Sequence, residues 1–227
     1  RVVLDIEGNQ REVYDALGRL VQTTTYNLAG TVIHTASMEA GRRWILKEVA
    51  DNPRHAWDSR GHHFRTEYDD VRRPVAFFRN KGDEPEKLTG RLVYGEDLPG
   101  AEQTNLRGQL VQTFDQAGLT RNDAYDYKGN VLGSSRQFAQ DYTATLDWGG
   151  DVPLETEIFA GQTRYDALNR PVQMIAPHSD QPGTGINALQ PGYNEAGLLE
   201  HVDAWLGLAS EPDGPLEPSS ASLHAVT

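Results

Sequence analysis

A short pattern of residues recurs along this chain and constrains its fold more than any other feature. Each copy has an aromatic residue, then aspartate or asparagine, two variable residues, glycine, a polar residue and an aliphatic residue. The clearest copy is YDALGRL at residues 14–20, and LDIEGN at residues 4–9 is a degenerate first copy. Self-similarity at a short period indicates a repeat architecture. The residues that the pattern assigns to structural turns are Tyr14, Asp15, Gly18, Tyr26, Gly30, Trp57, Asp58, Gly61, Tyr68, Asp69, Phe114, Asp115, Gly118, Tyr125, Asp126, Gly129, Tyr165, Asp166, Tyr193 and Gly197.

The chemistry of the pattern predicts a tight hairpin turn in each copy. Aspartate or asparagine at the first turn position accepts a hydrogen bond from the backbone amide two residues on. Glycine three residues after it takes the positive φ angle that such a loop needs. The aromatic residue ends one strand and the aliphatic residue begins the next, which leaves strands of about 4 to 8 residues. A lone hairpin cannot bury its apolar face, so the hairpins must pair into one continuous antiparallel, all-β sheet.

Four copies differ from the clearest copy, YDALGRL. Asn27 and Asn194 replace the aspartate but keep a turn acceptor, so we expect the same turn there. Arg72 and Asn169 replace the glycine, and we expect a different turn type in those two copies.

The distribution of proline, glycine and serine divides the chain. We expect a repeat sheet over residues 1–206, with loop-rich insertions near 80–105 and 177–192. Residues 207–227 are rich in proline and serine and predict a mobile tail or linker. Residues 37–50 fit either a helix or a strand–turn–strand, and residues 100–106 fit one helical turn.

Composition excludes several functions. The net charge is −12, so the chain lacks the basic face that a nucleic-acid binder needs. It has no cysteine, which excludes disulfides and thiolate metal sites. No stretch of about 18 apolar residues is present, so we expect no membrane insertion by this segment. The first residues, RVVLD, read as the middle of a strand, which suggests a segment of a longer chain whose open sheet edges favour self-association.

Three sets of residues could carry chemistry, and each has a simpler interpretation. His55, His62 and His63 lie near Asp58, but their spacing matches no common metal-ligand pattern. The motif aspartates could supply a glycosidase pair, but the turn role explains them all. The motif aromatics could stack on sugars, but packing between hairpins is favoured. We therefore predict no catalytic residue, no metal, no cofactor and no enzymatic activity.

Several stretches resemble a known family. YDALGRLV (14–21), YDYKGNVL (125–132) and YDALNRPV (165–172) resemble YD/RHS repeats. Residues 57–62, 64–69, 105–110 and 125–130 are similar to the RHS region of the B–C components of bacterial Tc insecticidal toxin complexes, and to related SpvB/TcaC-type proteins. The resemblance covers residues 1–206.

The resemblance implies a long, curved β-sheet that spirals into a hollow shell around a C-terminal effector polypeptide. The implied partners are the remainder of the protein's own longer chain, the encapsulated effector and other toxin-complex subunits, and the implied location is secreted or extracellular. The family's autoprotease signature, Asp-Pro-x-Gly, does not occur in this sequence, so neither protease nor toxin activity is assigned. The alternative function is a carbohydrate- or cell-surface-binding module, and a hydrolase is the weakest reading.

Overall fold

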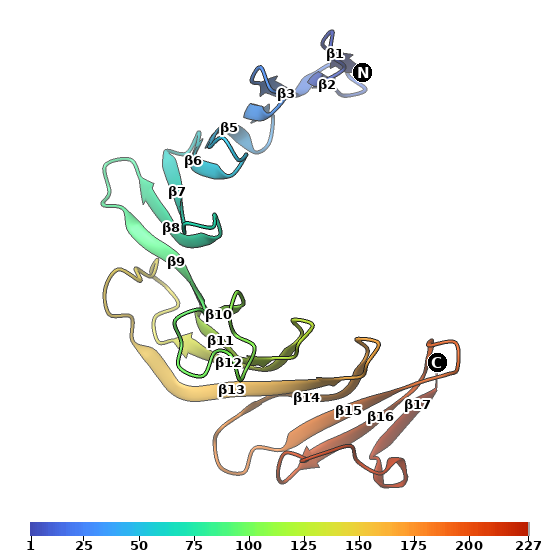
Figure 1. Cartoon of the computed structure of the whole chain (residues 1–227). Helices are drawn as coiled ribbons and strands as arrows, with labels where there is room; N and C mark the ends of the chain where they lie inside the picture. Colours follow the sequence, from blue (N-terminus) through green and yellow to red (C-terminus); the bar gives the residue numbers. More distant parts are fainter. Residues whose placement is uncertain (227) are drawn as a thin grey trace. The chain divides into compact units, whose positions relative to one another are not determined.

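The computed structural model describes residues 1–226 and shows an all-β protein (Figure 1). Among these residues there is no α-helix, and one short 3-10 helix covers Pro218–Ser220. Each pair of strands with a described register is antiparallel and joins neighbours in the sequence, as hairpins require. The predicted fold class is confirmed. The chain forms two compact units, residues 1–91 with 146–150, and residues 92–145 with the chain from 151 onward.

The first unit is a run of hairpins in a single layer. Its strands are β1 (Val2–Leu4), β2 (Gln10–Tyr14), β3 (Leu20–Tyr26), β4 (Val32–Ser37), β5 (Gly41–Lys47), β6 (Pro53–Asp58), β7 (His62–Tyr68), β8 (Pro74–Lys81) and most of β9 (Lys87–Tyr94). Within this unit only Ala76 and Leu146 are buried among the described hydrophobic residues. Backbone pairing and cross-strand side-chain pairs therefore stabilise the unit more than a thick core does.

The second unit has longer strands and two small cores. Its strands are β10 (Leu110–Asp115), β11 (Gly118–Tyr125), β12 (Val131–Ala139), β13 (Leu154–Tyr165), β14 (Pro171–Ser179), β15 (Ile186–Tyr193), β16 (Leu199–Leu208) and β17 (Leu223–Val226). One core contains Ala101, Leu106, Val111 and Tyr125. The other contains Ile175, Ile186, Ala188 and Trp205.

The two expected insertions are much shorter than predicted. Strand β9 lies within the first predicted insertion, near residues 80–105, so the loop before β10 covers only residues 95–109. Strands β14 and β15 fill most of the second, which leaves residues 180–185 as the loop. Proline is tolerated in β15 because its described pairing with β14 involves only Ala188 and Leu189, so Pro191 lies outside that ladder. The ambiguous segment 37–50 is a strand–turn–strand, and residues 100–104 form a single turn closed onto the Gly100 carbonyl.

The segment 207–227, predicted to be a mobile tail or linker, makes regular contacts over its described part. Residues 209–222, which we call the strap, cross one face of β13–β16. Gln173 and Gln190, on β14 and β15, bind its backbone at Gly214 and Leu216. Beyond the strap, β17 pairs with β16. Thr227 lies outside the described residues.

Candidate functional site

The repeat turn is a five-residue loop closed around one carboxylate. Asp15 Oδ1 accepts hydrogen bonds from the backbone N–H groups of Leu17 at 2.8 Å and Arg19 at 2.9 Å. The Gly18 N–H donates to the Asp15 carbonyl at 3.2 Å, and Gly18 has a φ angle of 75°. The side chain thus satisfies amides that the bend would leave unpaired.

The same two amide contacts, at the second and fourth residues after the acceptor, recur in both units. The other acceptors are Asp5, Asn27, Asp58, Asp69, Asp126, Asp166 and Asn194. Gly30, Gly61, Gly129 and Gly197 each have a positive φ angle in these turns. The acceptor side chain and the backbone twist are therefore local properties of the motif.

Arg72 and Asn169 occupy the glycine position without changing the turn. Their φ angles are 66° and 63°, and their N–H groups donate to the carbonyls of Asp69 and Asp166. The prediction of a different turn type is wrong, because the carboxylate and the flanking pairs hold even these residues in the left-handed region. One copy was missed: Asp51, with a φ angle of 67°, donates its N–H to the Glu48 carbonyl. It lacks both the aromatic residue and the aspartate that mark the other copies.

The copy at Phe114 has a different, tighter turn. Phe114 pairs with Leu119, and Asp115 pairs directly with Gly118, so only two residues form the loop. The Asp115 carboxylate accepts hydrogen bonds from Ala117 and Gly118 N–H and pairs with Arg136 at 2.7 Å. A Cβ atom at Gly118 would lie 2.2 Å from the Gln137 carbonyl oxygen. Because glycine has no Cβ atom, β11 and β12 can approach each other closely here.

The turn environment keeps the motif carboxylates ionised. A side-chain hydrogen bond from His62 is the main cause that lowers the pKa of Asp58 to about 2. The backbone N–H of Arg19 likewise lowers the pKa of Asp15. A general acid needs the opposite shift. Burial raises the pKa of Asp123, which is not a motif residue.

The motif tyrosines connect successive turns on one edge of the sheet. The hydroxyl groups of Tyr26, Tyr68 and Tyr193 donate to the carbonyls of Gln10 at 3.0 Å, Pro53 at 2.8 Å and Pro171 at 3.0 Å. Each acceptor is the first residue of the strand that follows the previous turn on the same edge. Tyr125 makes the same bond to Leu110, at 2.5 Å.

The remaining motif aromatics have different surroundings. Tyr14 donates to Glu12 Oε2 at 2.7 Å, and Tyr165 pairs in register with Pro171. Guanidinium groups lie over several of the tyrosine rings, as Arg170 does at 4.4 Å from the Tyr193 ring centroid. A ring face that is covered in this way is less available to a sugar.

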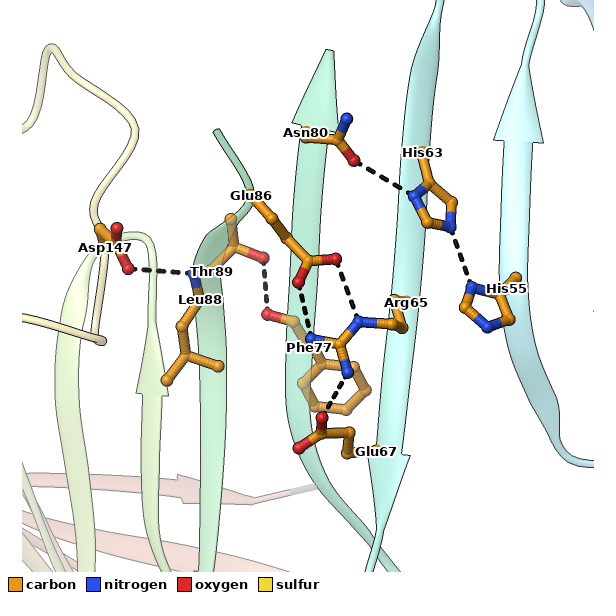
Figure 2. A network of polar contacts seen from close by, with 10 residues as sticks. All are labelled: His55, His63, Arg65, Glu67, Phe77, Asn80, Glu86, Leu88, Thr89 and Asp147. Atoms are coloured by element: carbon orange, nitrogen blue, oxygen red, sulfur yellow. Dashed lines mark hydrogen bonds and ion pairs between the residues drawn. The ribbon is translucent and has the colours of Figure 1, made fainter. Parts of the chain in front are cut away.

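The histidines near Asp58 do not converge on one point. His62 Nδ1 lies 2.9 Å from Asp58 Oδ2 on one face. On the other face, His63 contacts His55 and Asn80, as Figure 2 shows. This follows from the alternation of side chains along a strand. Within residues 1–226, no group of three or more His, Cys, Asp or Glu side chains is arranged to hold a metal ion. No helix in the described part of the chain is long and apolar enough to cross a bilayer.

A row of aromatic side chains crosses the first unit and was not predicted. His34 pairs in register with Trp44, Trp44 with Trp57, and Trp57 with His63. The rings of Trp57 and His63 are 5.1 Å apart and nearly parallel. Trp44 and Trp57 each keep 38% of their surface exposed. No spacing in the sequence reveals this row, because only the strand register brings its members together.

Serial hairpins with an aspartate-capped turn at the strand ends define this chain as an all-β hairpin-repeat sheet. No protein-family model matches it. The chain is homologous to two Tc toxin subunits of Yersinia entomophaga. It is 28% identical to toxin subunit YenC2 over 62% of this chain and 17% of that protein, and 24% identical to toxin subunit YenC1 over 80% of this chain and 18% of that protein. The chain thus spans less than a fifth of each relative.

Solved structures share the fold. The crystal structure of TcdB2-TccC3 superimposes with a TM-score of 0.78 over 93% of this chain and 11% of that chain, at 23% identity. The Photorhabdus luminescens Tc holotoxin pore gives a TM-score of 0.79 over 93% of this chain and 10% of that chain, also at 23% identity. The predicted resemblance to Tc toxin components is confirmed.

Proposed function

We propose that this chain is part of the shell wall of an RHS-repeat toxin subunit, which encloses and protects an effector polypeptide. The observation that carries the proposal is the match of fold over 93% of the chain to Tc toxin structures, together with homology to two toxin subunits. In a wall of this kind, the paired backbone excludes proteases from the enclosed polypeptide. The partners are then the rest of the subunit, the effector and other toxin-complex subunits, and the complex acts after secretion.

We further propose that this segment is not an enzyme and needs no cofactor. The motif carboxylates are ionised and already accept backbone hydrogen bonds, so they are poor general acids. An activity screen that finds hydrolysis, with turnover lost in Asp58→Asn or Asp115→Asn and the fold retained, would contradict this.

The shell proposal is tested by opening the wall in the complete toxin subunit. Gly118→Val places a side chain against the backbone of β12 and separates β11 from β12. Gly150→Val is the matched control, because a Cβ atom at Gly150 meets nothing within 4 Å. We expect trypsin to degrade the effector in the Gly118 variant at a concentration that leaves it intact in the control. Equal resistance in both proteins, or no protection in the unmodified subunit, would refute the proposal.

The exposed aromatic row supports one alternative, a carbohydrate- or cell-surface-binding module. Trp44 and Trp57 lie side by side in register and present ring surface to solvent. On a glycan array, this alternative requires saturable binding that is lost in Trp44→Ala and Trp57→Ala and retained in Tyr142→Ala, an exposed aromatic outside the row. The absence of saturable binding by the unmodified chain eliminates it.

A further inference from the structure

Three side chains on one face of the first unit form a chain of hydrogen bonds across β6, β7 and β8. His55 Nδ1 lies 2.9 Å from His63 Nε2, and His63 Nδ1 lies 3.2 Å from Asn80 Oδ1 (Figure 2). The Asn80 amide Nδ2 donates to the Gly82 carbonyl at 3.2 Å. The chain ends in the turn between β8 and β9.

These contacts assign the protons. Because Asn80 Nδ2 must be the donor to a carbonyl, Asn80 Oδ1 is the acceptor that faces His63. His63 Nδ1 therefore carries a proton. In the neutral ring, His63 Nε2 then has a lone pair and accepts a hydrogen bond. His55 Nδ1 must then donate to it, which leaves His55 Nε2 as the free lone pair of the chain. All three bonds run in one direction.

We propose that His55, His63 and Asn80 form a pH-sensitive link between β6, β7 and β8, which accepts one proton intact and opens when it accepts a second. The first proton goes to His55 Nε2 and leaves every bond in place. The second must go to His63 Nε2, the acceptor of the bond from His55. That proton converts the contact into two donors facing each other, on two cationic rings whose centroids are 5.1 Å apart.

The surroundings oppose the charged state. Burial, followed by His63, Arg65 and Arg54, lowers the pKa of His55, and Glu86 opposes this only in part. Arg65 lies beside the pair on β7 and is itself held by Glu86 and Glu67 (Figure 2).

The other neighbouring strands add little that could neutralise a second proton. From β5, the residue in register with His55 is Leu46. From β8, Asn80 contacts His63, and the Phe78 ring lies against the Arg65 guanidinium, 3.8 Å from the ring centroid. Asp58, the nearest carboxylate on β6, interacts with His62 on the opposite face.

The direction of the pH effect follows from these facts. A histidine whose pKa is lowered in the folded state binds a proton more readily after the strands separate. The link is therefore fully stable above the ordinary histidine pKa of about 6.5 and weakens as the pH falls below it. The site of weakening is the β6–β7 pair, for which the described register has three residue pairs.

Hydrogen exchange of the intact chain at pH 7.5 and pH 5.5, corrected for the intrinsic rate, tests the proposal. We expect protection of the amides in residues 53–68 to fall by up to about tenfold at the lower pH, since a histidine of ordinary pKa, about 6.5, in the separated strands is protonated about ten to one at pH 5.5. The double variant His55→Gln with His63→Gln should lose this pH response. His62→Gln, which alters the adjacent histidine on the opposite face, should keep it. An equal fall in the double variant, or no fall in the unmodified chain, overturns the proposal.

A second measurement covers the case in which the double variant does not fold. Nitrogen NMR of the unmodified chain should show Nδ1–H tautomers for both His55 and His63 at pH 7.5. On acidification, the first proton should appear on His55 Nε2 while His63 Nε2 still accepts the hydrogen bond from His55. Two rings that titrate as equal, independent sites would overturn the proposal.

Discussion

At the scale of single residues, the turns tolerate side chains that the left-handed conformation disfavours. Asp51, Arg72 and Asn169, each in a turn between two paired strands, have positive φ angles. A non-glycine residue costs about 1 to 2 kcal/mol in that region. The acceptor at the start of the turn and the paired strands on either side hold the backbone there, so glycine is favoured in the motif without being required.

Arg72 allows this cost to be measured. Arg72→Gly should raise the free energy of unfolding by up to about 1 kcal/mol, because the φ angle of 66° then carries no steric cost. Its ion pair with Glu48, at 3.9 Å on the surface, contributes little that would be lost. Asp70→Gly, two positions earlier in the same turn and with an ordinary φ angle, should lower stability. Urea denaturation compares the two, and an equal loss in both would contradict the argument.

At the scale of strands and turns, tyrosine hydroxyl groups fasten one hairpin to the next. Tyr125 is 6% exposed, and its hydroxyl donates to the Leu110 carbonyl and accepts from Asn122. Tyr127, two residues later in the same turn region, is 80% exposed. Comparing Tyr125 with Tyr127 therefore measures how much a buried, hydrogen-bonded tyrosine hydroxyl contributes to stability relative to an exposed one.

Tyr125→Phe should lower the free energy of unfolding by about 1 kcal/mol, the usual value of a hydrogen bond of this kind. Tyr127→Phe should change it by less than about 0.5 kcal/mol, as for other surface substitutions. Thermal or urea unfolding distinguishes these values. If both substitutions were neutral, the tyrosines would act through ring packing alone.

The strap is the second feature at this scale. Trp205 is 3% exposed beneath it, and its Nε1–H donates to Ser220 Oγ at 3.0 Å. Trp205→Ala should lower stability by about 3 to 5 kcal/mol, as for other buried aromatic residues, and should increase hydrogen exchange in residues 209–222. Trp44→Ala, in the exposed row, should have a smaller effect. Free exchange of the strap in the unmodified chain would show that it does not pack as described.

At the scale of the whole molecule, charge is distributed unevenly while the turn chemistry is shared. Acidic and basic residues balance in the first unit, so the net negative charge belongs to the second. Aspartates with a lowered pKa occur in both units, including Asp15, Asp69, Asp126 and Asp166. Acid should therefore act on both units through the same groups.

We expect stability to fall between about pH 4 and pH 2. A carboxylate with a lowered pKa stabilises the fold above its unfolded pKa of about 3.9, and this contribution is lost as the pH falls through the folded value, which is about 2 for Asp58. Urea midpoints at pH 7, 4, 3 and 2 test this, and Asp58→Asn should flatten the slope. A midpoint that does not change from pH 4 to pH 2 would contradict it. This window lies below that of the histidine link.

The amino-acid sequence alone determines the hairpin repeat, because an aspartate and a glycine three residues apart act on backbone groups within five residues. Turns such as those at Asp15 and Asp126, the strands between them and the all-β class could be predicted on that basis. The left-handed Arg72 and the turn at Glu48 could not, since flanking strand pairs impose them.

Only the tertiary structure decides which distant residues meet. Strand register places His34, Trp44, Trp57 and His63 in one row, and a one-residue slip would send alternate members to the opposite face. The strap looks like a linker in the sequence because its partners, Gln173 and Gln190, lie more than 20 residues away. Local chemistry bends this chain, and non-local pairing sets which surfaces it presents.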